Sequence, residues 1–188
     1  MNLALKLTFL RILLAPVFAW ALLQSPGNLS FLWLSLVLAV ILEATDYFDG
    51  FVARKFNMTS EAGKILDPMA DSIARLTCFL AFFQLNHASI WMVLVFVYRD
   101  SLVSGLRILA ASQSKILGAR GSGKFKAVVQ ALAIVGIPLV LLAQQYGINI
   151  YMDPSTIIFI LMLIAVIGTL YSLWDYLYAN RSIISQLV

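Results

Sequence analysis

Four aspartates follow one another at short intervals, where one apolar segment of the chain ends and the next begins. Asp46 and Asp49 are three residues apart, and Asp67 and Asp71 are four residues apart. On helices these spacings bring each pair of carboxylates to a shared face. Carboxylate oxygens are the ligands that Mg²⁺ and Mn²⁺ prefer, whereas zinc favours nitrogen and sulfur. The spacing therefore predicts a site for a hard divalent cation between two helices.

A network of ion pairs is the alternative explanation for these acidic groups. An ionised carboxylate at the centre of a membrane helix costs about 2.5–3.5 kcal/mol by insertion scales, so the aspartates need compensation of some kind. The small residues among them, Gly50, Ala53 and Gly63, would let a ligand approach the backbone closely, which ion pairs do not require. We therefore favour a metal site. Glu43, one turn before Asp46, fits either a supporting place near the metal or a buried, paired carboxylate.

The composition is that of an integral membrane protein. Of the 188 residues, 62% are hydrophobic and 12% are charged, whereas soluble domains are about half apolar and about a quarter charged. The net charge of +4 comes without the dense basic tract that nucleic-acid binding requires, so no nucleic-acid partner is expected. Membrane lipids and phosphates are the expected partners of the scattered lysines and arginines.

Six apolar stretches are each long enough to cross a bilayer, which takes about 20 residues. They run over residues 5–23, 29–52, 65–85, 90–111, 125–143 and 156–177. Lysines and arginines gather in alternate connections, so the positive-inside rule places both termini and the aspartates on the cytoplasmic side. Since no repeat or linker interrupts the chain, we expect one all-α domain over residues 1–188. It would be integral to the inner or plasma membrane, with six transmembrane helices and a cytoplasmic active site.

Taken together, the spaced residues resemble a known signature. The pattern Asp-x2-Asp-Gly-x2-Ala-Arg-x8-Gly-x3-Asp-x3-Asp is complete between residues 46 and 71, and it resembles the signature of the CDP-alcohol phosphotransferases. Those enzymes move a substituted phosphoryl group from a CDP-linked donor to an alcohol and release CMP, in a six-helix membrane fold. Such transfer needs oxygen ligands that hold metal ions against the pyrophosphate. The resemblance implies two ions, Mg²⁺ or Mn²⁺, and a homodimer.

The resemblance also implies roles for individual residues. The metal ligands would be Asp46, Asp49, Asp67 and Asp71. Asp71 would in addition be the catalytic general base that takes the proton of the acceptor hydroxyl. The small residues would admit the cytidine nucleotide, while an arginine pairs with its phosphates. The implied CDP-binding residues are Asp46, Gly50, Ala53, Arg54 and Gly63.

Two further stretches indicate which alcohol accepts the group. Residues 98–107 look like the Arg-Glu-x3-(Ser/Thr)-x-Leu-Arg stretch of the phosphatidylglycerophosphate synthases, and residues 123–130 resemble their Gly-Lys-x-Lys-Thr-x2-Gln. The cations in them would lie near one helix face and at the start of another helix, where a phosphate is favoured. We expect CDP-diacylglycerol as donor and glycerol 3-phosphate as acceptor. The residues expected to bind the acceptor phosphate are Arg99, Arg107, Lys124 and Lys126.

Other interpretations stay open at this point. Ser72 stands where that subfamily usually has lysine, and Asp100 replaces its glutamate. Phosphatidylinositol-phosphate, cardiolipin and phosphatidylserine synthases share the signature and differ in the acceptor. Intramembrane acids can also mark a cation or proton transporter, although here the acids gather near one face of the membrane. Contact with lipid head groups alone is the other interpretation of these cations, and it suits Lys115 and Arg120 more readily than Arg99.

Overall fold

The structure, a computed structural model, describes residues 3–55, 61–112, 120–148 and 151–185. The side chains of residues 3–7, 46–55, 61–67, 111–112 and 183 lie outside the described part. The described chain is helical apart from its connections. The helices are α1 (Leu3–Leu23), α2 (Leu29–Lys55), α3 (Glu61–Gln84), α4 (Ile90–Ser112), α5 (Gly121–Gln145), α6 (Pro154–Ala179) and the single turn α7 (Arg181–Ile184).

Each of the six expected spans coincides with one long helix, so the all-α prediction is confirmed. Within the described residues, α5 and α6 are long and apolar enough to cross a membrane, judged by length and composition. Among the described side chains of α1 and α2, the apolar stretches are Thr8–Leu23 and Leu29–Thr45. The crossing of the membrane by all six helices, and the cytoplasmic position of both termini, stay predictions.

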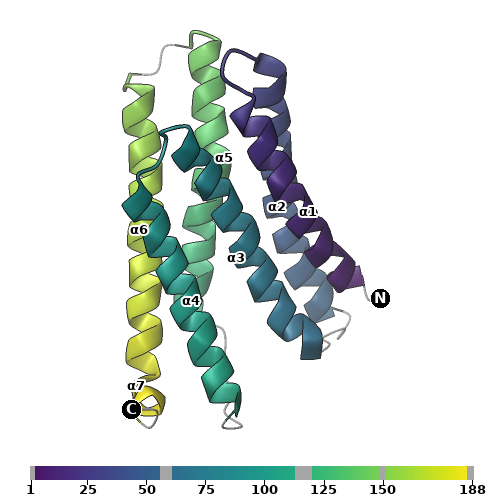
Figure 1. Cartoon of the computed structure of the whole chain (residues 1–188), viewed down its shortest axis with the longest axis vertical. Helices are drawn as coiled ribbons and strands as arrows, with labels where there is room; N and C mark the ends of the chain where they lie inside the picture. The colour runs from purple at the N-terminus through teal and green to yellow at the C-terminus, as the bar shows by residue number, and fades with distance from the viewer. Residues whose placement is uncertain (1–2, 56–60, 113–119, 149–150, 186–188) are drawn as a thin grey trace.

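The six long helices run alternately up and down in one bundle (Figure 1). α1 packs against α2 and α3, α5 packs against α6 and α2, and α4 packs against α6 and α3. The connections after α1, α3 and α5 lie at one end, which we call the loop end. At the other end α2 and α4 finish and α3 and α5 begin, and we call it the aspartate end. Both termini lie toward the aspartate end.

Local chemistry sets several helix boundaries at the loop end. Asn28 caps α2, because its Oδ1 accepts a hydrogen bond from the backbone N–H of Ser30 at 3.1 Å. Gly27 has a φ of +77°, a conformation that glycine adopts without steric cost. Asp153 caps α6 in the same way as Asn28 caps α2, and Pro154 occupies the first turn of that helix. These residues turn the chain back into the bundle.

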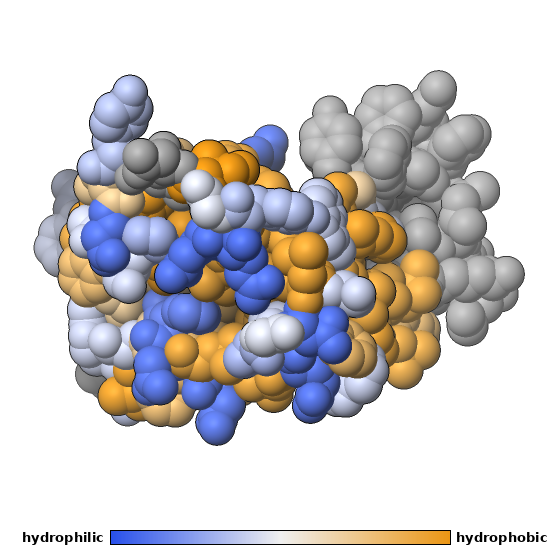
Figure 2. Space-filling view, turned by 90° about the horizontal axis from the view of Figure 1, so that it is seen from above, coloured by the Kyte–Doolittle hydropathy of each residue, from blue (hydrophilic) through white to orange (hydrophobic). Residues whose placement is uncertain are grey.

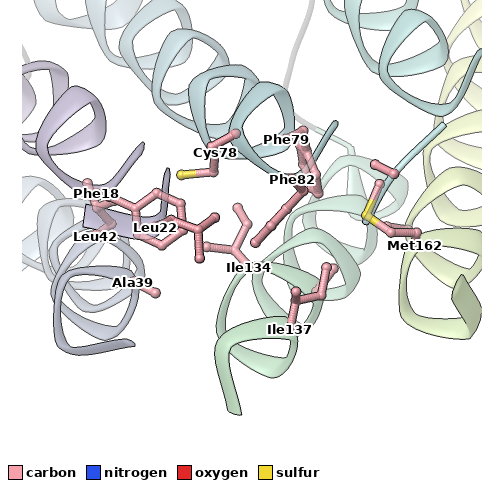
Figure 3. Packing of buried hydrophobic residues seen from close by; sticks show 14 of the residues in the cluster. Phe18, Leu22, Ala39, Leu42, Cys78, Phe79, Phe82, Ile134, Ile137 and Met162 are labelled. Atoms are coloured by element: carbon pink, nitrogen blue, oxygen red, sulfur yellow. The ribbon is translucent and has the colours of Figure 1, made fainter. Parts of the chain in front are cut away.

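Buried apolar side chains fill the middle of the bundle (Figure 3). The ring of Phe79 on α3 lies 4.3 Å from the ring of Phe96 on α4, measured between centroids. α5 and α6 approach each other closely at Gly168. A Cβ atom added there would lie only 2.6 Å from Cγ2 of Val129. Small residues permit such close helix packing, which stabilises helix pairs inside membranes. This packing fixes the helices that carry the charged residues described below.

The outside of the bundle is apolar. More than half of the side-chain surface of Trp20, Leu80, Leu132 and Trp174 is exposed. Figure 2 shows the loop end, where many hydrophilic residues lie on the surface with hydrophobic residues between and beside them. Large exposed apolar surfaces mark contact with membranes or with other proteins. The distribution suits a bundle whose sides face lipid and whose ends face water.

Candidate functional site

The C-terminal part of α2 and the N-terminal part of α3 carry the four aspartates to the aspartate end. The side chains of Asp46, Asp49 and Asp67 lie outside the described residues. The other expected CDP-binding residues, Gly50, Ala53, Arg54 and Gly63, are described by their backbone only. The side chain of Asp71 belongs to the described part.

A contact between α2 and α3 fixes how far along the bundle axis the aspartates of the two helices lie. Arg75 donates a hydrogen bond from Nη2 to Oε2 of Glu43 at 2.9 Å. Glu43 precedes Asp46 by three residues in α2, and Arg75 follows Asp71 by four residues in α3. Because α2 runs toward the aspartate end and α3 runs away from it, positions 46 and 71 both lie about one turn closer to that end than this pair. The backbone therefore brings aspartate positions of the two helices to one level.

The Glu43–Arg75 pair also decides between the two sequence-based interpretations of Glu43, since the structure shows a paired carboxylate. Glu43 and Arg75 are both mostly shielded from solvent, with 17% and 10% of their side-chain surfaces exposed. Arg75 donates a second hydrogen bond, from Nη1 to the carbonyl oxygen of Ala127 at 3.0 Å. Removing either partner of a buried ion pair is strongly destabilising. Arg75 thus ties α2, α3 and the beginning of α5 together.

Asp71 forms an ion pair with Arg11 of α1. Ion pairing, which the spacing argument had placed second, is therefore present at this aspartate. Within the described residues, His, Cys, Asp and Glu form no group of three or more that could hold a metal ion. Three of the four expected ligands lie outside that part, so the two-ion site stays a prediction.

A polar cavity of about 290 Å³ opens beside Asp71, between α3, α4 and α5. All four residues expected to bind the acceptor phosphate line it, together with Asp71. The cationic side chains in its described lining are Arg75, Arg99, Arg107, Arg120, Lys124 and Lys126, and the carboxylates are Asp71 and Asp100. Such an excess of positive charge in a recess attracts a phosphate group.

Two of the expected phosphate-binding cations are held by a carboxylate. Lys126 donates from Nζ to Oδ1 of Asp100 at 2.5 Å, and Arg99 donates from Nη1 to the same oxygen at 2.9 Å. Asp100 and Lys126 are buried. Buried charges persist in proteins when they are paired in this way. Arg99 and Lys126 are therefore a fixed part of the cavity wall.

Unlike that pair, Arg107 and Lys124 are not held by a carboxylate among the described residues. The Nε atom of Arg107 is buried, and it has no hydrogen-bond partner among the described residues. A buried donor that lacks a hydrogen-bond partner costs about 1–3 kcal/mol. A phosphate oxygen in the cavity that accepted a hydrogen bond from this Nε would remove that cost. Lys124 is exposed in the first turn of α5. That helix begins without a side-chain cap, which leaves N–H groups of its first turn available to an anion.

Arg120, for which contact with lipid head groups was the favoured interpretation, lines the polar cavity. It donates from Nε and Nη2 to the two carboxylate oxygens of Asp175 on α6, at 2.7 and 2.9 Å. Ser122 donates to Asp175 at 2.6 Å. Sequence reasoning missed this cluster because no short spacing links the beginning of α5 to the end of α6. Lys115, expected to behave like Arg120, lies outside the described residues.

An apolar groove of about 410 Å³ adjoins the polar cavity between α3 and α4. The two hollows share lining residues, among them Ser72 and Arg107. The groove itself is lined by side chains such as Met69, Ile73 and Ile108. A cationic recess next to an apolar groove suits an amphiphilic molecule, with its phosphate in one and its hydrocarbon in the other.

Comparison with known proteins agrees with this geometry. A family model described as CDP-alcohol phosphatidyltransferase matches residues 1–171. The chain is 31% identical, over 95% of its length and 95% of the relative's, to a protein of Bacillus subtilis (strain 168) named CDP-diacylglycerol–glycerol-3-phosphate 3-phosphatidyltransferase. Proteins with the same name from Blochmanniella floridana and Yersinia enterocolitica are 31% and 30% identical, over 98% and 95% of this chain and 94% of each relative. The chain is therefore an enzyme that belongs to the CDP-alcohol phosphatidyltransferase family.

Proposed function

We propose that the enzyme transfers the phosphatidyl group of CDP-diacylglycerol to glycerol 3-phosphate, giving phosphatidylglycerophosphate and CMP. The observation that carries the proposal is the polar cavity, in which Asp71 lies beside a group of cations and next to an apolar groove. The relatives named for this reaction match nearly the whole chain, which supports the choice of both substrates.

The cavity favours an acceptor that carries a phosphate. Six cations against two carboxylates leave an excess of positive charge in its described lining. Serine, the acceptor of the phosphatidylserine synthases, would leave this charge without a partner. Inositol phosphate would fit the charge as well as glycerol 3-phosphate does, but the names of the relatives favour glycerol 3-phosphate. Arg107 and Lys124 would hold the phosphate, and the pair of Arg99 and Lys126 would add to the positive field.

The reaction forms a bond between the acceptor oxygen and the phosphorus of the phosphatidyl group, and it breaks the bond from that phosphorus to CMP. Asp71 would take the acceptor's proton, a role supported by its position in the lining of the cavity that would hold the acceptor. Asp46, Asp49, Asp67 and Asp71 would hold two Mg²⁺ or Mn²⁺ ions, which when bound offset the charge of the donor's pyrophosphate. Gly50, Ala53, Gly63 and Arg54 would receive the cytidine nucleotide.

We further propose that residues 1–188 form one membrane domain with its aspartate end in the cytoplasm. The connections at the loop end, residues 24–28, 85–89 and 146–153, contain neither lysine nor arginine, whereas both are frequent near the aspartate end. Glycerol 3-phosphate and CDP-linked lipid head groups would then reach the cavity from the cytoplasm. The family resemblance favours a homodimer.

An acceptor panel tests the proposal. Purified enzyme with Mn²⁺ or Mg²⁺ should release CMP from CDP-diacylglycerol when glycerol 3-phosphate is added, and much less with inositol phosphate, serine or phosphatidylglycerol. Asp71→Asn should abolish this release while the protein stays folded in the membrane fraction, because the amide keeps the shape and loses the charge. Preference for another alcohol would overturn the choice of acceptor, and near-normal turnover by Asp71→Asn would overturn the role of Asp71.

A further inference from the structure

Three residues in the last turns of α6 contact arginines of the polar cavity. Ser172, Asp175 and Tyr176 are spaced by three and four residues from the first, so they share one face of the helix. Ser172 and Tyr176 are buried, with 0% and 2% of their surfaces exposed. The family model matches the chain only up to residue 171, so the match itself gives these residues no role.

Two of the contacts are hydrogen bonds to guanidinium groups. Arg99, which Asp100 holds from one side, donates from Nη2 to Oγ of Ser172 at 2.8 Å. Arg120 donates two hydrogen bonds to the carboxylate of Asp175. Such a bidentate pair fixes the plane of the guanidinium group as well as its position. α6 therefore sets the orientation of cations that belong to α4 and to the beginning of α5.

The third contact is between Arg107 and the aromatic ring of Tyr176. The guanidinium carbon lies 5.8 Å from the centroid of the ring, within the range of a cation–π interaction. A cation–π contact uses the charge of the guanidinium group and does not require its N–H groups as donors, so it is compatible with an anion bound to them. The buried Nε of Arg107 has no hydrogen-bond partner among the described residues, which fits a side chain held ready for a ligand.

We propose that Ser172, Asp175 and Tyr176 are positioning residues, which orient three arginines of the polar cavity before the acceptor's phosphate arrives. Arginine side chains are long and flexible, and ordering them during binding reduces affinity. Holding them in advance removes that cost. The inference rests on the proposed function in one respect, which is that the acceptor's phosphate occupies this cavity.

Asp175 allows the sign of the effect to be tested. A carboxylate near the cavity could instead act as a competitor that repels the phosphate. Removal of a competitor would tighten the binding of the phosphate, whereas removal of a positioning group would weaken it. Asp175→Asn therefore separates the two roles by the direction of the change. Asp153→Asn is the matched control, because it makes the same substitution at the other end of α6, where asparagine caps a helix as well as aspartate does.

The experiment compares Ser172→Ala, Asp175→Asn and Tyr176→Leu with the unchanged enzyme and with the Asp153→Asn control. Binding of inorganic phosphate and of glycerol 3-phosphate to the purified protein is measured by calorimetry, and steady-state kinetics are measured with both substrates varied. Each of the three variants should weaken the binding of both anions about three- to tenfold, the range of one lost hydrogen bond or cation–π contact. The KM for glycerol 3-phosphate should rise by the same factor, whereas kcat and the KM for CDP-diacylglycerol should change less than about twofold.

Tyr176→Phe keeps the aromatic ring and should bind phosphate as tightly as the unchanged enzyme does. If Tyr176→Leu weakened binding only through misfolding, the ring would not be the feature that restores it. Tighter phosphate binding by Asp175→Asn, unchanged binding by all three variants, or an equal loss for donor and acceptor would each overturn the positioning role. Failure of the proposed function is a separate result. It would show as no CMP release by the unchanged enzyme with glycerol 3-phosphate, while the phosphate-binding series would still test the positioning role.

Discussion

Replacement of Arg107 by glutamine should weaken the binding of the acceptor, glycerol 3-phosphate, and leave the binding of the donor, CDP-diacylglycerol, almost unchanged. Arg107 lines the polar cavity, and its buried Nε has no hydrogen-bond partner among the described residues. A hydrogen bond that involves a charged group contributes about 1.5–3 kcal/mol, which corresponds to about a ten- to a hundredfold change in binding. We expect the KM for glycerol 3-phosphate to rise by about that factor, because the phosphate loses its partner and glutamine is neutral.

The assay is CMP release by purified enzyme with both substrates varied. The KM for CDP-diacylglycerol should change less than about twofold, since the substitution leaves the four aspartates intact. Arg181→Gln is the matched control. Arg181 also lies over a tyrosine of α6, with its guanidinium carbon 4.6 Å from the centroid of the Tyr178 ring, but it is not among the described residues that line the cavity. This control should keep both KM values.

Two results would refute the reasoning about Arg107. An equal rise in both KM values would mean that the substitution disturbs the bundle and not one substrate. An unchanged KM for glycerol 3-phosphate would mean that the acceptor's phosphate binds outside the polar cavity. A thermal unfolding curve of the variant distinguishes the first case from a true effect on both sites.

Three further predictions concern stability and the metal. Lys126→Met should destabilise the protein by about 3–5 kcal/mol, because it removes one partner of the buried pair with Asp100; a thermal melt in detergent measures the loss, and an unchanged melting temperature would contradict it. Gly168→Ala should cost about 1–3 kcal/mol by the same measurement, since the new methyl group would meet Val129 on α5. A chelator should stop CMP release, and Mg²⁺ or Mn²⁺ should restore it; activity that persists without divalent ions would exclude the two-ion proposal.

The helices were predictable because their signal is local. Apolar runs of about 20 residues, interrupted by turn-forming residues such as Pro26 and Gly27, indicate helices without knowledge of their neighbours. The gathering of Arg99, Arg107, Lys124 and Lys126 around one cavity agrees with the family resemblance, which implied that these residues form one phosphate-binding group.

The contacts that organise the cavity could not be predicted, because each joins helices that are distant in the sequence. The choice of partner depends on how the helices cross. Glu43 could have faced a metal, but it pairs with Arg75 of α3. Arg120 could have faced lipid, but it reaches Asp175 across 55 residues. Local spacing contains no information on such pairs, and the charges in the sequence are compatible with many different pairings.

The place of Asp100 shows why pairing matters for function as well as for stability. A carboxylate in the wall of the polar cavity weakens the positive field that the proposed phosphate site needs, so by charge alone its presence is unfavourable. Without it, however, Arg99 and the buried Lys126 would repel each other, and the cost of burying their charges would not be offset. Asp100 neutralises one of six cations and in return fixes two of them in place. The cavity keeps an excess of positive charge, and under the proposed function a phosphate would meet side chains that are already ordered.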